Sequence, residues 1–196
     1  MSNEDTTGRS YTSRLTRLSG AGWKQRLDVQ APYRWNLRRL LGGRQVLDVG
    51  CGIGRNLVGL EDGSVGVDHN PHSVQHCRSL GLQAYTAEDF HAGQHEKFDG
   101  LLLAHVVEHL PPGAEAEVLR EYLPYVNPGS PVVLICPQER GFATDSTHTT
   151  FFDFAGLRGV CAEAGLAVEK AYSFPFPRFA GKLFPYNEFV VLAHTR

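Results

Sequence analysis

The stretch VLDVGCGIGRN, residues 46–56, decides the fold of this chain. Its first part, Val46 to Val49, is an apolar run short enough for a buried parallel strand. The glycines that follow, Gly50, Gly52 and Gly54, let the backbone turn sharply and approach a ligand without a Cβ in the way. A loop of this kind between a strand and a helix is typical of a nucleotide-type binding turn.

Composition places the chain among ordinary globular proteins. With 196 residues it can bury a sizeable core in one domain, and a net charge of −2 gives no reason to expect a nucleic-acid partner. The four cysteines form no Cys-x-x-Cys pair and are expected to be reduced, buried thiols. Because the start of the chain does not read as a signal peptide, and no run is apolar for about 20 residues, we expect a cytoplasmic protein without a membrane segment.

The chain divides into three parts. Residues 1–10 are polar and are predicted to be a disordered tail. Residues 11–43 carry apolar positions at helical spacing and end at Gly42-Gly43, which suits a helix C-terminus. This helical segment either packs on the sheet or forms a lid over the glycine loop. Residues 44–196 then form the main domain.

Short apolar runs alternate with helical segments along that domain. A short helix is expected over residues 55–60, a second strand over residues 64–68 and a helix over residues 72–80. Such alternation predicts an α/β fold with a Rossmann-like, mostly parallel seven-stranded sheet, helices on both faces and an antiparallel last strand. Ligands of such sheets bind beyond the carboxyl ends of the strands.

Five segments then add up to a recognisable pattern: VLDVGCGIGRN, VGVDHNP, AEDF, FDGLLLAHVVEHLPP and NPGSPVVLICP. In order and spacing they resemble the motifs of class I S-adenosylmethionine-dependent methyltransferases, in particular the small bacterial enzymes of the methyltransferase type 11 and type 23 group. The resemblance covers residues 44–196 and implies S-adenosyl-L-methionine as cofactor. A nicotinamide dinucleotide is the competing cofactor, but its fingerprint needs a third glycine where this chain has Asn56 and Leu57.

The resemblance implies how the glycine loop would hold the cofactor. Gly50, Gly52 and Gly54 would lie under its methionine part, with Cys51 among the cofactor-binding positions as a packing residue rather than a catalytic thiol. Asp48 would support the loop and meet the amino group of the cofactor, directly or through water.

Three further segments would complete the cofactor site. Asp68 lies 20 residues after Asp48, and a carboxylate there can accept two hydrogen bonds from the ribose diol. His69 or Asn70 would lie against the adenine, in a pocket lined by Glu88, Asp89 and Phe90, and the sulfonium end would be reached by Ala104, His105 and Val106. The choice between Glu88 and Asp89 stays open, because the adenine-binding acid often stands nearer to Thr86.

Methyl transfer from a sulfonium needs alignment, exclusion of water and, for some acceptors, a general base. The candidate bases are His105, His109 and His148, since each is expected at the ligand-binding end of the sheet. No metal is expected, because Glu108-His109 after this strand is common in the family without one. The alternative is a metal site of His105, Glu108, His109 and His148, which loosely resembles the metal-binding set of small-RNA 2′-O-methyltransferases.

Two later segments border the expected acceptor site. Asp145-x-x-His148-x-x-Phe151 resembles a pattern seen in many enzymes of this group, and Thr149 or Thr150 is expected to cap the following helix. Residues 174–186 are rich in aromatic residues and proline, and they are expected to line an apolar acceptor, plug the core or contact a second subunit. Arg178 and Lys182 there could meet an anionic substrate.

The sequence therefore predicts a methyltransferase that acts on the oxygen, nitrogen or carbon of a small-molecule acceptor by direct displacement. The alternatives are a metal-assisted methyltransferase and a cofactor-binding protein without transferase activity that serves a protein partner.

Overall fold

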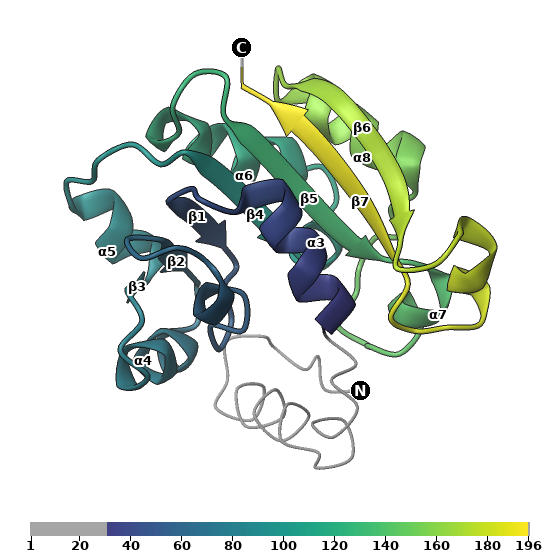
Figure 1. The fold of residues 1–196 in the computed structure, drawn as a ribbon, viewed down its shortest axis with the longest axis horizontal. Coiled ribbons are helices and arrows are strands. Elements are labelled where there is room, and N and C mark those ends of the chain that lie inside the picture. The colour runs from purple at the N-terminus through teal and green to yellow at the C-terminus, as the bar shows by residue number, and fades with distance from the viewer. Residues whose placement is uncertain (1–30, 196) are drawn as a thin grey trace. The chain divides into compact units, whose positions relative to one another are not determined.

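The computed structural model describes residues 31–195, which group into two compact units that divide between Gln94 and His95 (Figure 1). The predicted tail, residues 1–10, and residues 11–30 of the predicted helical segment lie outside the described residues.

Over residues 31–94 the first unit is a small parallel sheet with three helices. Its elements are α3 (Ala31–Leu41), β1 (Val46–Val49), β2 (Val65–Val67), α4 (Pro71–Ser79), β3 (Ala84–Tyr85) and α5 (Ala87–Ala92). The strands run in the order β3-β2-β1, with Leu47 opposite Val65 and Gly66 opposite Ala84. All residues of β1 and β2 are buried, as expected for apolar runs in a parallel sheet.

Local sequence explains where α3 ends and where α4 begins. Helix α3 ends before Gly43, whose φ of 73° is in the left-handed region that favours glycine. At the start of α4 the Asn70 side chain accepts a hydrogen bond from the backbone N–H of His72 at 3.0 Å, and Pro71 occupies the first turn. The helix predicted over residues 72–80 is therefore confirmed to within one residue at either end.

One local prediction differs from the structure. The helix expected over residues 55–60 is only a 3-10 turn, Leu57–Gly59, because no side chain caps it and so short a segment does not offset the cost of helix nucleation. The residues after β3 form helix α5, whose first turn is capped by Thr86, with the backbone N–H of Asp89 donating to its hydroxyl at 3.1 Å.

The second unit holds the other four strands. Its elements are β4 (Gly100–Ala104), α6 (Glu115–Tyr122), β5 (Pro131–Pro137), α7 (Glu139–Phe142), α8 (Phe154–Glu163), β6 (Ala167–Phe174) and β7 (Glu188–His194), with 3-10 turns at Val107–His109, Leu123–Tyr125 and Arg178–Lys182. The strand order is β4-β5-β7-β6. Strands β4 and β5 are parallel, and β7 is antiparallel to both β5 and β6.

Burial explains the roles of these elements. Every residue of β4 and β5 is buried, which matches their uninterrupted apolar sequences, and α8 packs against β6 and β7 (Figure 1). Helix α8 begins at Phe154 and is capped by Asp153, which accepts from the N–H of Gly156 at 2.9 Å, so the expected cap at Thr149 or Thr150 is wrong. Seven strands and an antiparallel last strand confirm the predicted α/β class. No helix between residues 31 and 195 is long and apolar enough to cross a membrane.

Candidate functional site

The glycine loop has the backbone that the sequence predicted. Gly50, Gly52 and Gly54 have φ values of 75°, 54° and 79°, which residues with a Cβ rarely adopt. The N–H groups of Gly50 and Cys51 donate to the carbonyl of Val67 at 2.7 and 3.1 Å, so the loop is tied to the end of β2.

Two thiols pack beneath this loop. A Cβ on Gly54 would lie 3.0 Å from Cys77 Sγ and 2.6 Å from Leu82 Cδ1. Cys77 donates its thiol proton to the carbonyl of Gly52 at 3.3 Å, and both Cys51 and Cys77 are buried. These positions fit the interpretation of Cys51 as a packing residue.

Asp48 is a charged residue inside the core of the first unit. It is fully buried in β1, and neither carboxylate oxygen has a hydrogen-bond partner among residues 31–195. Burial raises the pKa of Asp48 to about 7, which outweighs the lowering by the Asn56 side chain, and the nearby Asp68 raises it further. A buried carboxyl without a partner is unfavourable for folding, so a hydrogen-bond donor or cation placed beside it would stabilise the protein.

Asp68, at the end of β2, organises the loop directly. Its carboxylate is buried and accepts from the N–H of Gly52 at 2.7 Å and from the N–H of Asn70 at 2.8 Å. The imidazole of His69 lies 3.7 Å from Asp68 Oδ1 and is largely exposed. Because a carboxylate can accept about four hydrogen bonds, Asp68 retains capacity for the ribose contact predicted for it.

The predicted adenine-binding residues occupy different environments. Glu88 and Asp89 are exposed on the first turn of α5, where Asp89 lies 3.8 Å from Arg78. Phe90 is fully buried and packs edge-on against Tyr85, with 6.4 Å between the ring centroids. Glu88, Asp89 and Phe90 are consecutive residues of α5. Their contacts with adenine stay predictions.

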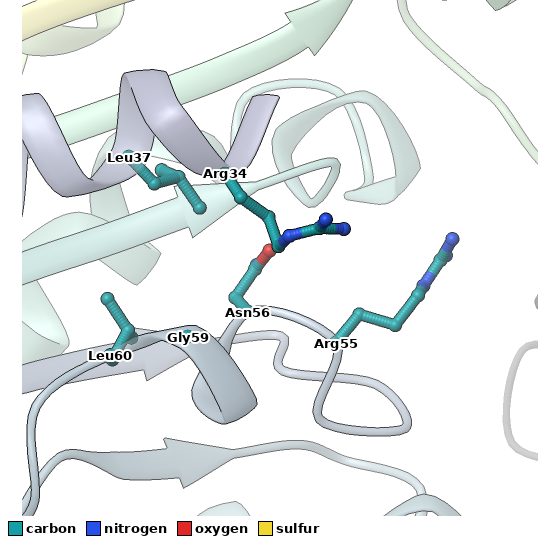
Figure 2. Close-up of a pocket in the computed structure, with 6 residues that line it drawn as sticks. All are labelled: Arg34, Leu37, Arg55, Asn56, Gly59 and Leu60. Carbon is teal, nitrogen blue, oxygen red and sulfur yellow. The ribbon is translucent and has the colours of Figure 1, made fainter. Parts of the chain in front are cut away.

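A pocket of about 220 Å³, its open mouth included, lies beside the glycine loop (Figure 2). It is lined by Arg34, Leu37, Arg55, Asn56, Gly59 and Leu60. Figure 2 shows Arg34 of α3 reaching over Asn56. The side-chain oxygen of Asn56 also accepts from the hydroxyl of Tyr33 at 3.1 Å. Sequence reasoning did not single out Asn56, whose role depends on α3 lying above the loop.

In the second unit, His105 follows β4 and is held between two carboxylates. Its Nε2 lies 2.9 Å from Glu188 Oε1 and its Nδ1 lies 3.4 Å from Glu108 Oε1. Burial lowers the pKa of His105, but the carboxylates of Glu108 and Glu188 raise it to about 10. A protonated imidazole has no free lone pair, so this geometry favours His105 as a partner of the carboxylates over a role as general base.

His105 also has an unusual backbone. Its φ is 60°, in the left-handed region that few residues other than glycine adopt. This conformation ends β4 abruptly and begins the turn that carries Val107–His109. The partner Glu188 was missed in the sequence, although an acid at the start of the apolar segment EFVVLA was a usable signal.

Glu108 is the central carboxylate of this region. Its side chain is fully buried, Oε2 accepts the thiol proton of Cys136 at 3.5 Å, and Oε1 has no hydrogen-bond partner in the described part of the chain. Burial raises the pKa of Glu108, but His105 reverses the effect, and the net direction is downward. Glu108 is therefore ionised inside the protein.

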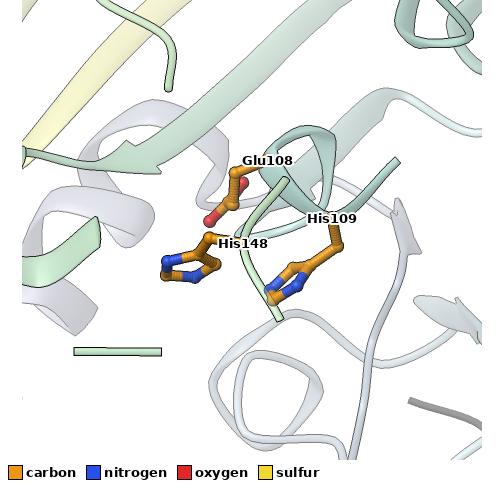
Figure 3. A group of neighbouring side chains, drawn as sticks. All are labelled: Glu108, His109 and His148. Atoms are coloured by element: carbon orange, nitrogen blue, oxygen red, sulfur yellow. The ribbon is translucent and has the colours of Figure 1, made fainter. Parts of the chain in front are cut away.

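The other two predicted bases lie together. The rings of His109 and His148 are 4.7 Å apart between centroids, and Glu108, His109 and His148 place one donor atom each within 4.8 Å of one another (Figure 3). Burial lowers the pKa of His109, so this imidazole is neutral at pH 7. Of the four residues in the metal alternative, the structure thus gathers three, and His105 is outside this group.

The remaining predicted segments have identifiable structural roles. Thr149 donates its hydroxyl to the carbonyls of Glu108 and Leu110, at 3.0 and 2.7 Å, which fixes the loop beside the histidines. Arg178 is paired with Glu139, its Nη1 donating at 2.8 Å. In the aromatic segment 174–186 several side chains are exposed: Phe176, Phe179, Leu183 and Tyr186.

Sequence comparison identifies the class. Residues 47–134 match the family model for a methyltransferase domain of type 11. This match and the solved structures described below confirm the predicted resemblance to class I S-adenosylmethionine-dependent methyltransferases. No curated protein sequence matches the chain significantly.

Solved structures show the same fold. An S-adenosylmethionine-dependent methyltransferase from Archaeoglobus fulgidus is 21% identical with a TM-score of 0.66, over 88% of this chain and 98% of that one. Magnesium protoporphyrin IX methyltransferase from Synechocystis, with S-adenosylhomocysteine bound, is 14% identical with a TM-score of 0.70, over 98% and 97% of the two chains. The 1,6-didemethyltoxoflavin-N1-methyltransferase of Burkholderia thailandensis is 19% identical with a TM-score of 0.60, over 95% and 88%.

Proposed function

We propose that this protein is an S-adenosylmethionine-dependent methyltransferase that acts on a small-molecule acceptor by direct displacement. The observation that carries the proposal is Asp48, a buried carboxyl beside the glycine loop whose oxygens have no hydrogen-bond partner among the described residues. The methionine part of the cofactor carries an ammonium group, and this cation would supply the missing partner, directly or through a water molecule.

The rest of the loop fits the same cofactor. Three glycines in the left-handed conformation keep side chains away from the methionine part, and Asp68 has hydrogen-bonding capacity left for a ribose diol. Asn70, whose N–H is bound to Asp68, and His69 beside it are the residues proposed to lie against the adenine.

S-adenosylmethionine, when bound, supplies an activated methyl group on a sulfonium, so the protein needs no covalent nucleophile. The chain contributes binding, orientation and, where the acceptor must lose a proton, a base. His109 suits that last role, because its imidazole is neutral at pH 7 and its Nδ1 faces Thr147, which leaves Nε2 with the lone pair. Ala104, His105 and Val106 remain the residues proposed for the sulfonium end.

A small-molecule acceptor is supported by the similar proteins and by the surface of the second unit. Two of the similar structures are named as methyltransferases of a porphyrin and of a toxoflavin precursor. Exposed aromatic side chains in residues 174–186 offer apolar area for such an acceptor. A cytoplasmic location fits this role and stays a prediction.

The proposal is tested by Asp68→Ala, with Asp62→Ala, an exposed acid, as the matched control. Calorimetric titration with S-adenosylhomocysteine should show affinity reduced on the order of 100-fold in Asp68→Ala, because two hydrogen bonds to a charged group are lost. Asp62→Ala should bind like the wild type. Equal binding by both variants would contradict the assignment of Asp68.

Turnover separates the enzyme from the alternative of a cofactor-binding protein. Incubation with labelled S-adenosylmethionine and metabolite extracts should transfer label to a small molecule with the wild type and not with Asp68→Ala. Tight cofactor binding with no transfer in any extract would instead favour a binding protein that serves a protein partner.

A further inference from the structure

We infer that Glu108, His109 and His148 form a binding site for a divalent transition-metal ion. Their donor atoms lie within 4.8 Å of one another, and Figure 3 shows the two imidazoles and the carboxylate of Glu108 converging from the turn after β4 and from the loop before α8. One metal ion with bonds of about 2.0–2.2 Å places two donors at most about 4.4 Å apart. Small side-chain rotations are therefore enough to close the set around an ion.

The hydrogen bonds of His109 orient it as a ligand. Its Nδ1 lies 3.1 Å from the hydroxyl of Thr147 and 3.3 Å from the carbonyl of the same residue. Thr147 donates its hydroxyl proton to Asp145 at 2.7 Å, so its oxygen accepts the proton of His109 Nδ1. This chain of bonds leaves Nε2 of His109 with a lone pair. A bound ion takes up that lone pair, so His109 acts as the base of the proposed function only in the metal-free protein.

His148 is fixed in the same way by a different partner. Its Nδ1 lies 2.7 Å from the carbonyl oxygen of Phe142, which can only accept, so Nδ1 carries the proton. The ring also stacks on Phe142, with 5.0 Å between centroids. Metal-binding histidines typically donate the second ring N–H to a carbonyl or a carboxylate-linked group, and both histidines here have that arrangement.

Glu108 supplies the third donor as a fully buried carboxylate. Cys136 donates to its Oε2 at 3.5 Å, which orients the group, and its Oε1 has no hydrogen-bond partner within residues 31–195, His105 Nδ1 lying 3.4 Å away. His105 is not a ligand in this proposal, because its two ring nitrogens face Glu108 and Glu188.

The donor set selects the kind of ion. Two imidazoles and one carboxylate favour zinc, cobalt, iron or nickel over magnesium, which prefers oxygen donors. Three protein ligands leave coordination positions open. These open positions suit an oxygen atom of the methyl acceptor. That assignment rests on the proposed function, whereas the binding of the ion does not rest on it.

The test uses Co²⁺, whose visible absorption reports its ligands, added to the full chain after treatment with a chelator. The wild type should bind one Co²⁺, and His148→Gln and His109→Gln should each bind it at least 100-fold more weakly. Thr147→Val should weaken binding about 10-fold, as expected for a residue that orients a ligand. His91→Gln, an exposed histidine on α5, and Thr150→Val are the controls and should bind like the wild type.

Two results would overturn the site. One is Co²⁺ affinity that is the same in His148→Gln, His109→Gln and the wild type while thermal melting shows all three folded. The other is an intense near-ultraviolet band, which indicates thiolate coordination and would place the ion at a cysteine. Titration with S-adenosylhomocysteine under the same conditions tests the cofactor site of the proposed function independently. A failed test of the metal site therefore does not contradict the proposed function, and a failed test of the cofactor site does not contradict the metal site.

Discussion

Asp48, in strand β1, and Glu108, in the turn after strand β4, are both fully buried carboxyl groups. Their pKa values nevertheless shift in opposite directions. Asp48 has no partner among the described residues, and its pKa is raised to about 7. Glu108 faces His105, and its pKa is lowered. Equal burial therefore shifts the two pKa values in opposite directions, because among the described residues an imidazolium faces Glu108 and no cation faces Asp48.

The difference shows which region depends on a bound molecule. Among its described residues, the first unit gives its buried acid no hydrogen-bond partner, which costs stability that a cationic ligand can restore. The second unit surrounds its acid with imidazoles and a thiol, so it is held in place before any ligand binds. We expect the glycine loop to gain most of its stability from the cofactor and the region around Glu108 to be preorganised.

The largest effect should come from Asp48→Asn. The folded-state pKa of about 7 exceeds the ordinary value of 3.8, so the contribution of this carboxyl to stability is full below about pH 4 and is lost as the pH rises through about 7. Asp48 alone should lower the free energy of unfolding by about 2–3 kcal/mol between pH 5 and pH 8. In urea denaturation without cofactor at pH 8, Asp48→Asn should therefore unfold at a higher urea concentration than the wild type. If the free energy of unfolding depended on pH in the same way in the wild type and in Asp48→Asn, Asp48 would have a partner.

Gly54→Ala should destabilise the loop by about 2 kcal/mol, because it adds a Cβ at a φ of 79° and within 3.0 Å of Cys77 Sγ. Thermal denaturation should show a midpoint lowered by roughly 4–8 °C. Gly159→Ala is the control, since this exposed glycine of α8 has open space around its Cβ position. Gly159→Ala should raise the free energy of unfolding by about 0.5–1 kcal/mol through helix propensity. If it instead lowered that free energy as much as Gly54→Ala does, the effect at Gly54 would not come from the conformation of the loop.

A smaller effect with the opposite sign to Asp48→Asn is expected at Glu108. Glu108→Gln at pH 7 with a chelator present should lower the free energy of unfolding by about 1–2 kcal/mol, because His105 loses one of its two carboxylates. The figure is below that for a fully buried pair because the His105 side chain is 40% exposed. Glu117→Gln, on the exposed side of α6, should change nothing measurable. Increased stability in Glu108→Gln would mean that Glu108, like Asp48, is an unpaired charge.

Much of the fold could be predicted because its signals are local. The run Val46 to Val49, the turn at Gly50 to Gly54 and the cap at Asn70 and Pro71 each depend on neighbours within a few residues. The prediction of a helix over residues 55–60 was wrong, because apolar spacing alone does not show whether so short a segment can nucleate a helix. The cap of α8 was misplaced because Thr149 is used by Glu108 and Leu110, which lie about 40 residues earlier in the chain.

The sequence by itself determined the class of the protein and the residues from which its sites are drawn, because glycine conformation, strand composition and motif order are properties of short segments. Only the tertiary structure decided what each ionisable group does. Asp48 has no hydrogen-bond partner among residues 31–195, His105 is held between Glu108 and Glu188, and the ring of His109 lies against that of His148. A pKa and a ligand set depend on atoms that folding brings together from distant parts of the chain.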